Sequence, residues 1–262
     1  MGILPLLLGV ISAVSSAQST ARAIGHADVS LLSETDHPRP GSTFLIGIRI
    51  VPGTGWHGYW SNPGDSGIPP VVNWKAPRGL RFGPLLHPAP TLLRVAGVTS
   101  YVHTGEHVLL ARVRTPSTLK SGTPLPIEGQ IVFATCSSSL CVPQRATLQL
   151  MLTVGDGAAN KSANSVKSAL QRLPTKLGTG SFSGRGHAVR MQVPKAANVN
   201  PARATFFPSS NEMLAASTLR VRPVRGRLVI LGSLISGKAR PTISGVLTDG
   251  ERSYALTFRR SK

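Results

Sequence analysis

Hydrophobic and polar residues alternate in short stretches through most of the first 155 residues. A period of two is typical of β-strands with one buried face. Turn signals such as Pro52-Gly53 and Thr104-Gly105 separate the stretches. The expected strands are residues 26–32, 43–51, 71–74, 99–103, 107–115, 126–134 and 146–154. About seven short strands in roughly 130 residues predict an immunoglobulin-like β-sandwich.

The pattern changes after residue 155. Four apolar residues recur at helical spacing before Pro174: Ala163, Val166, Leu170 and Leu173. This spacing predicts one short amphipathic helix. Alternation then returns, with expected strands at residues 189–193, 204–207, 219–224, 228–234, 242–247 and 254–259. We therefore expect an all-β protein: a sandwich over 24–155, a linker with a short helix over 156–180, and a second, smaller β domain over 181–262.

The N-terminus indicates export. Residues 3–14 are apolar and uncharged, and Ala21-Arg22-Ala23 follows them. This apolar run is too short for a bilayer, which needs about 20 residues, and the small residues behind it suit a cleavage site. Residues 1–23 are therefore expected to be a signal peptide, and the mature protein a soluble, periplasmic one. The alternative is a buried N-terminal strand.

Charge is unevenly distributed. The net charge is +19, and residues 156–262 hold 18 of the 29 Lys and Arg but only 4 of the 10 Asp and Glu. Export and the scatter of the basic residues along strand-like stretches argue against nucleic acid as a partner. The favoured interpretation is solvated strand faces. The alternative is weak contact with anionic lipid headgroups or an acidic partner.

The two cysteines, Cys136 and Cys141, are the candidate chemistry. In an exported chain they can form one disulfide. So short a loop would contribute only about 2 kcal/mol to stability, near the low end for disulfides. Redox exchange therefore suits the pair better than bracing, although spacing alone leaves a structural bridge open. No histidine lies nearby in sequence to complete a metal site.

A second cluster is aromatic. Trp56, Tyr59 and Trp60 lie in the segment GWHGYWSNPGDSG, residues 55–67. Such a segment can be core and corner, or it can cover a reactive disulfide. The chain has no nucleophile elbow, zinc-protease motif or phosphate-binding loop, and no cofactor is expected.

The segment GWHGYWSNPGDSGIPP, residues 55–70, resembles the N-terminal periplasmic domain of DsbD-like thiol:disulfide interchange proteins, including the suppressor-of-copper-sensitivity branch. The resemblance covers about residues 26–155 and continues through NWKAPRGL (73–80), Tyr101 and the two cysteines with Val142-Pro143. One departure is the cysteine spacing, which is one residue longer than the pattern of that branch.

The resemblance implies an immunoglobulin-like domain whose cysteine pair is reduced by a membrane-embedded partner. The pair then passes electrons to periplasmic thioredoxin-like proteins. Cys141 would be the sulfur attacked by the partner's thiolate, and Cys136 the resolving cysteine. Trp56, Tyr59, Trp60 and Tyr101 would shape or shield the site. The processes implied are cytochrome c biogenesis and copper tolerance.

The transmembrane and thioredoxin domains of full-length relatives are not in the sequence, so a separate membrane electron donor is expected. The alternatives are a passive redox partner, and a fragment or degenerate copy of a longer protein. The expected function is that of a protein-disulfide reductase component. Two alternatives stay open: a non-catalytic binding module with a structural disulfide, and a copper-stress protein that binds Cu(I) through the thiolates.

Overall fold

The computed structural model describes residues 26–261, apart from residues 196 and 237–239. The elements in this part are strands, except for helix α1 (Ala163–Gln171) and the 3-10 turn η1 (Ala216–Thr218). The predicted all-β class is therefore confirmed. The expected signal peptide lies outside the described residues.

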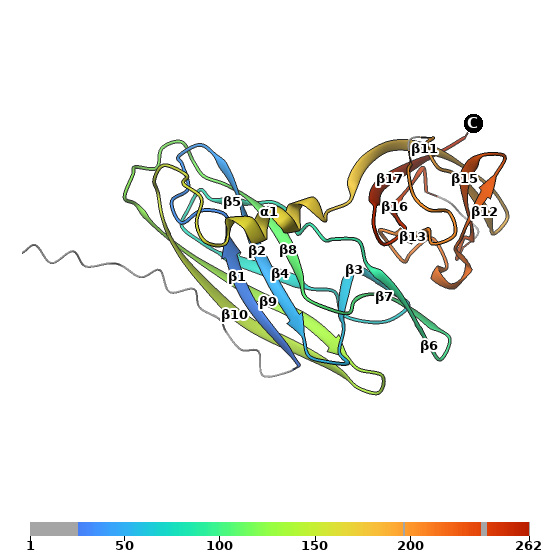
Figure 1. Ribbon diagram of the computed structural model, residues 1–262, viewed down its shortest axis with the longest axis horizontal. Helices are drawn as coiled ribbons and strands as arrows, with labels where there is room; N and C mark the ends of the chain where they lie inside the picture. Colours follow the sequence, from blue (N-terminus) through green and yellow to red (C-terminus); the bar gives the residue numbers. More distant parts are fainter. Residues whose placement is uncertain (1–25, 196, 237–239, 262) are drawn as a thin grey trace, which may run out of the picture.

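Two sheets form a sandwich in the first domain (Figure 1). The first sheet has the order β1 (Ala27–Ser33), β2 (Thr43–Pro52), β8 (His107–Arg114) and β5 (Arg81–Phe82). The second has the order β10 (Cys141–Thr153), β9 (Pro124–Cys136) and β4 (Val71–Lys75). Alternate residues of each strand turn inward, as Ile127, Ile131 and Phe133 do on β9, and pack against Ile46 and Ile48 of β2 in one core. Each such buried side chain contributes about 1.5–3 kcal/mol of hydrophobic stabilisation.

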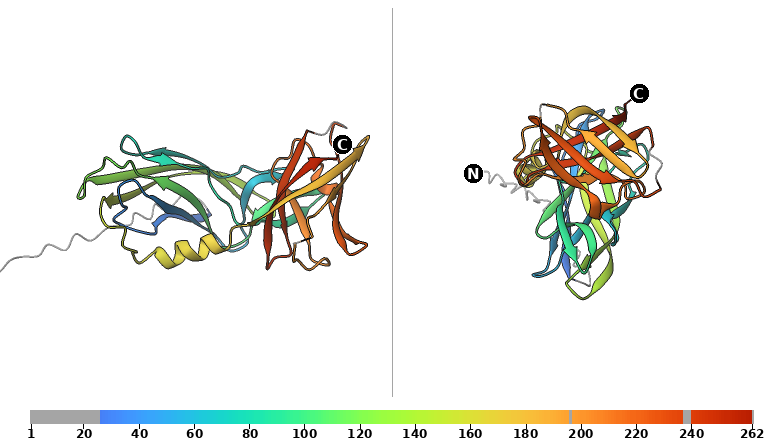
Figure 2. Two further views of the ribbon diagram at one scale, coloured as in Figure 1. Left: turned by 90° about the horizontal axis from the view of Figure 1, so that it is seen from above. Right: turned by 90° about the vertical axis from the view of Figure 1, so that its right-hand side faces the viewer.

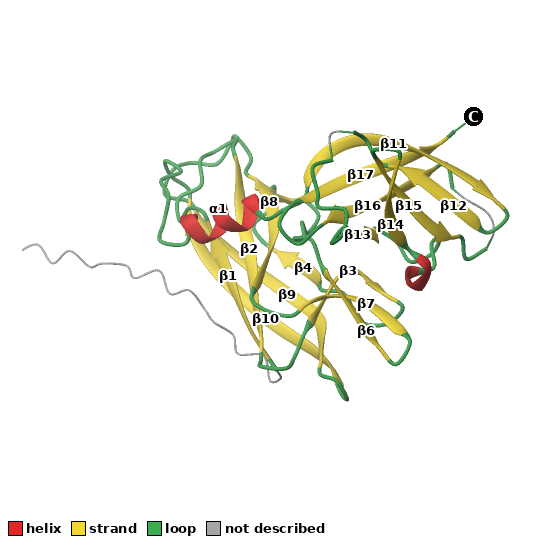
Figure 3. Cartoon of the chain, turned by 45° about the vertical axis from the view of Figure 1, so that its right-hand side comes forward, coloured by secondary structure: helices red, strands yellow, loops and turns green. Residues whose placement is uncertain are grey.

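A third, smaller sheet lies at one end of the sandwich. Its order is β3 (Gly58–Gly64), β7 (Val98–His103) and β6 (Thr91–Val95). Figures 1 and 3 show this sheet beside the second domain. It therefore carries the aromatic segment between the two halves of the molecule.

Helix α1 confirms the predicted amphipathic helix. Val166 and Ala169 are buried against Leu32, Leu45 and Leu110 of the sheet that contains β1, β2 and β8. Figure 2 shows the helix along one side of the sandwich, ahead of the chain's entry into the second domain. No helix among the described residues is both long and apolar enough to cross a membrane.

The second domain contains one curved sheet of seven strands (Figure 3). Its order is β13 (Thr205–Pro208), β16 (Thr242–Thr248), β17 (Ser253–Arg260), β11 (Thr175–Arg185), β12 (Ala188–Gln192), β15 (Arg227–Ser233) and β14 (Arg220–Val224). Strand β11 begins at Thr175, inside the stretch expected to be linker, because it pairs in parallel with β17. Phe182, Met191, Ile230 and Phe258 are buried in the core of this domain.

The two domains share a small apolar cluster. Trp60 and Tyr101 of the first domain pack against Phe207 of the second, with ring centroids 6.3 Å and 5.0 Å from the Phe207 ring. Nearby, the side-chain amide of Asn62 donates to the carbonyl of Pro208 at 2.7 Å. The aromatic segment therefore contributes directly to the interdomain contact.

Candidate functional site

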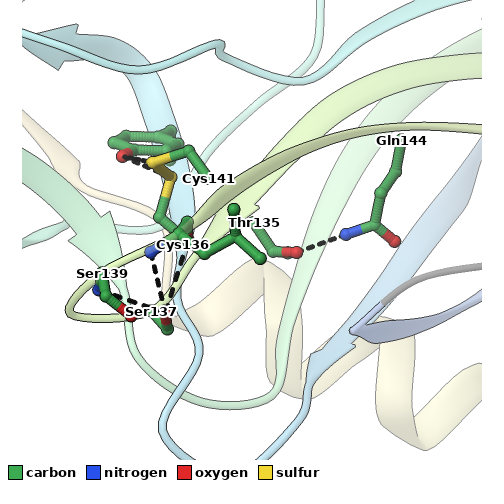
Figure 4. Close-up of a disulfide and its surroundings, with 8 residues drawn as sticks. Thr135, Cys136, Ser137, Ser139, Cys141 and Gln144 are labelled. Atoms are coloured by element: carbon green, nitrogen blue, oxygen red, sulfur yellow. Dashed lines mark hydrogen bonds between the residues drawn. A yellow bond between two sulfur atoms is a disulfide. The ribbon is translucent and has the colours of Figure 1, made fainter.

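The cysteines close the longest hairpin of the sandwich. Strands β9 and β10 each run for 13 residues and pair from Thr153 opposite Pro124 to Cys141 opposite Cys136. Opposed residues of an antiparallel ladder bring their side chains close together. Cys136 and Cys141 accordingly form a disulfide at the tip, as Figure 4 shows.

Ser137 organises the four residues between the cysteines. Its hydroxyl oxygen accepts hydrogen bonds from the backbone N–H groups of Ser139 at 3.3 Å and Leu140 at 3.1 Å. Its own backbone N–H donates to the carbonyl of Leu140 at 2.8 Å. Serine favours such local turns because its short side chain can reach backbone groups two or three residues away. The tip is therefore a defined turn that holds Cys141 opposite Cys136.

The two half-cystines differ in exposure. The residue Cys136 is only 2% exposed to solvent, whereas Cys141 is exposed. The backbone of Cys136 is also fixed, because its N–H and C=O both bond the backbone of His57, each at 2.9 Å. Attack by an external thiolate depends on access to the sulfur. Cys141 is therefore the more accessible half-cystine of the pair.

Tyr59 lies against the buried sulfur. Its hydroxyl donates to Cys136 Sγ at 2.9 Å and lies 3.8 Å from Cys141 Sγ. Burial raises the pKa of the Tyr59 phenol, so the hydroxyl stays protonated and remains a donor at neutral pH. The ring of His57 meets the Tyr59 ring edge-on at 5.5 Å, and burial lowers the pKa of that imidazole.

A glycine lets the chain pass directly over the Tyr59 ring. Gly67 has a φ of 120°, and a Cβ atom placed there would lie 2.2 Å from Cε1 of Tyr59. Only a residue without a side chain fits both the backbone angle and the space. The aromatic pattern of residues 55–67 points to the segment as a whole and not to Gly67. The Ser66-Gly67 dipeptide was the available signal.

The four aromatic residues expected at the site lie in three places. Tyr59 contacts the disulfide, while Trp60 and Tyr101 belong to the cluster with Phe207 of the second domain. Trp56 stacks on His26 with ring centroids 3.6 Å apart. The separation of Tyr59 from Trp60 follows from strand geometry, because adjacent residues on β3 point to opposite faces.

Three histidines form a further group, in which His103 and His107 are buried and His87 is half-buried. The rings of His103 and His107 stack at 4.3 Å. Burial and neighbouring imidazoles lower the pKa of His103, and the same causes lower that of His87 to about 4. Burial also lowers the pKa of His107, whose Nδ1 lies 2.9 Å from the Gly105 carbonyl oxygen. Within the described residues, no group of three or more His, Cys, Asp or Glu side chains has the geometry to hold a metal ion.

Comparison with protein families finds a match for the first domain. Residues 28–153 match the family model of the N-terminal part of the thiol:disulfide interchange protein DsbD. The match covers the sandwich, the aromatic segment and both cysteines. No curated protein matches the chain at the sequence level.

The solved structures extend the likeness to both domains. The N-terminal periplasmic domain of ScsB from Proteus mirabilis has a TM-score of 0.71 and 16% sequence identity, and the match covers 94% of this chain and 100% of that one. At this identity the likeness concerns the fold. A chimeric titin Z1Z2 structure matches with a TM-score of only 0.20 at 13% identity, over 93% of this chain and 99% of that one.

Proposed function

Because residues 28–153 match the family model of the DsbD N-terminal domain, we propose that the protein carries out thiol:disulfide interchange and that Cys136–Cys141 is the bond that opens and closes. The observation that carries this proposal is the asymmetry of the pair. One half-cystine, Cys141, is exposed at the hairpin tip, and the other, Cys136, is buried under the Tyr59 hydroxyl. A bond that only braces the fold has no need of a reachable sulfur beside a shielded one.

The exchange proceeds in two steps. A thiolate of the electron donor attacks Cys141 Sγ, the S–S bond breaks, and its electron pair leaves with Cys136 as a thiolate. The donor's second thiolate then attacks the donor sulfur in the mixed disulfide, which releases Cys141 and leaves the donor oxidised. Two electrons have moved to this chain. With an acceptor the sequence reverses: Cys141 attacks the acceptor disulfide, and Cys136 resolves the mixed disulfide.

Tyr59 assists by binding the leaving sulfur. Its O–H already points at Cys136 Sγ in the oxidised form, and a hydrogen bond to the charged form of an acid lowers the pKa of that acid. The bond therefore strengthens as negative charge develops on Cys136. A thiol with a lower pKa leaves faster in disulfide exchange.

The surface around Cys141 suits a protein partner. Leu140 beside it is 54% exposed. Ile68, whose carbonyl accepts from the Ala134 backbone N–H two residues before Cys136, is 41% exposed. Apolar side chains around an accessible sulfur favour a protein over a small hydrophilic thiol. We propose thioredoxin-like periplasmic proteins as acceptors and a separate membrane protein as donor, with this chain in the periplasm.

The reduction potential of Cys136–Cys141 tests the proposal. The protein is equilibrated against glutathione and dithiothreitol buffers, and free thiols are alkylated and counted by mass spectrometry. An exchangeable bond should have a potential between about −200 and −280 mV. A potential well below about −300 mV would instead support a binding module with a structural disulfide.

A trapping experiment tests which sulfur meets the partner. Cys136→Ser leaves Cys141 free but removes the resolving cysteine, so mixed disulfides with thioredoxin-like proteins should accumulate. Cys141→Ser is the matched control and should trap little, because Cys136 is buried. Equal trapping by the two variants would contradict the assignment of Cys141 as the reacting sulfur.

A further inference from the structure

A cavity of about 520 Å³ lies between the two domains. Strands β6 and β7 line it from the first domain, and β13, η1, β14 and residues 200–204 line it from the second. Figures 1 and 3 show the small sheet of the first domain facing this part of the second. Small-molecule sites have volumes of roughly 300–1,000 Å³ and occur preferentially at domain interfaces.

The charges around this interdomain cavity have one sign. Its charged lining residues are Arg94, Arg220 and Arg222, and no Asp or Glu is among the described residues that line it. The guanidinium of Arg220 is held in place, because Nη1 donates to the carbonyls of Ser217 and Leu219 at 2.8 Å and 2.7 Å. The backbones of Arg94 and Arg222 pair within the sheets, but their side chains form no hydrogen bond or ion pair with any described residue. Both therefore retain their donors for a ligand.

The rest of the lining is largely apolar. Leu92, Phe206, Ala216 and Val221 contribute to it. An inorganic anion would lose hydrating water against such surfaces without gaining apolar contacts. An organic anion can place its apolar body there. The combination of guanidinium groups with apolar walls therefore selects for ligands that have both parts.

Tyr101 adds a polar group to the apolar part of the wall. Its side chain is 1% exposed, and its hydroxyl has no hydrogen-bond partner among the described residues. Burial, together with the nearby Asp65 carboxylate, raises the pKa of this phenol, so the hydroxyl stays protonated. Asp65 itself accepts a hydrogen bond from the Thr99 backbone N–H at 2.9 Å. The Tyr101 hydroxyl is thus a donor without an acceptor.

We propose that the interdomain cavity binds a small organic carboxylate with an apolar body. The carboxylate pairs with Arg94 and Arg222, for which guanidinium groups have the matching planar geometry. The apolar body lies against Leu92 and Ala204, which line the cavity and are partly exposed. This site is separate from the proposed disulfide exchange, because the two lie on opposite faces of β7. Tyr101 packs towards the second domain, whereas its neighbour Val102 packs beside Cys136.

The test uses 8-anilinonaphthalene-1-sulfonate, an aromatic anion whose fluorescence rises in apolar surroundings, titrated into the whole protein. We expect saturable binding that naphthalene-1-carboxylate displaces and that the neutral naphthalene-1-carboxamide does not. The double variant Arg94→Gln/Arg222→Gln should weaken binding by roughly tenfold or more, since two charge-assisted contacts are lost. Tyr101→Phe, which keeps the aromatic ring, should weaken it several-fold.

The matched control is Arg185→Gln/Arg259→Gln, which removes two exposed arginines elsewhere on the second-domain sheet. This control should bind the probe as the unaltered protein does. An equal loss of affinity in both double variants would show adventitious binding to a basic protein and overturn the proposal. Displacement by the carboxamide as effectively as by the carboxylate, or the absence of saturable binding, would overturn it as well.

Discussion

Substituting Tyr59 with phenylalanine removes the hydroxyl that donates to Cys136 Sγ at 2.9 Å and keeps the ring that packs beside it. A hydrogen bond to a neutral acceptor contributes about 0.5–1.5 kcal/mol, and one to a charged acceptor about 1.5–3 kcal/mol. The reduced form with a Cys136 thiolate therefore loses about 1–1.5 kcal/mol more than the oxidised form does. Tyr59→Phe should make reduction of the disulfide less favourable.

The expected shift follows from the two-electron relation, in which about 30 mV corresponds to about 1.4 kcal/mol. The reduction potential should become more negative by about 20–30 mV. Reduction by dithiothreitol should slow by up to about 5–10-fold, because Cys136 is the leaving group in attack on Cys141. The shift should be larger at pH 9 than at pH 7, since the usual thiol pKa of about 8.5 lies between them. Burial raises the pKa of Tyr59 itself, so it is still a donor at pH 9.

Both quantities are measured by alkylation of free thiols, at equilibrium for the potential and at timed intervals for the rate. Tyr254→Phe is the matched control, because Tyr254 packs against the core of the second domain. It should leave both quantities unchanged. If Tyr59→Phe had the unaltered potential at both pH values and the unaltered rate, the hydroxyl would have no part in stabilising the leaving sulfur.

Three further predictions concern stability and can be checked by urea denaturation. Gly67→Ala should lower the free energy of unfolding by about 2–4 kcal/mol, because the new Cβ meets the Tyr59 ring. The control Gly97→Ala, at a positive φ but with open space around it, should lower it by only about 1 kcal/mol. An equal loss of unfolding free energy in the two variants would contradict this reasoning. His87, with a pKa of about 4 when folded and about 6.5 when unfolded, is neutral in the folded protein at pH 5, while the unfolded chain takes up a proton. Stability should therefore fall between pH 6.5 and 4, by up to about 3 kcal/mol from this group, and less in His87→Gln; equal stability at pH 7 and 5 would argue against it. Asn62→Ala removes a buried donor to the Pro208 carbonyl of the second domain and should lower the free energy of unfolding by about 1–3 kcal/mol. An unchanged urea midpoint would mean that water replaces this hydrogen bond.

Alternation and turn signals were sufficient to predict most of the sandwich and the helix from Ala163. They did not predict that β11 begins at Thr175. Its sequence, TKLGTGSFSGR, is rich in glycine and small polar residues, which are poor strand formers by themselves. The strand is stabilised by antiparallel pairing with β12 and by parallel pairing with β17, where Tyr254, the partner of Thr175, lies almost 80 residues further along the chain. A partner so distant leaves no local signal.

The candidate site could be predicted in part. Cysteine spacing and the resemblance pointed to a local disulfide, and Cys136 and Cys141 do form one. Spacing does not reveal which sulfur is buried, because that depends on the backbone pairing of Cys136 with His57 from a distant segment. The period of two on β3 implies that Tyr59 and Trp60 face opposite ways, but not that Trp60 meets a second domain.

The position of the disulfide at the very end of a long hairpin has a consequence for divergence within such a domain. The register of β9 and β10 is fixed along 13 paired positions and by the core behind them, so the four residues of the tip do not determine it. Insertions, deletions or substitutions in the tip can therefore change the shape and polarity presented around Cys141 while the sandwich stays as it is. The tip is where such a domain can acquire a different partner without having to be refolded.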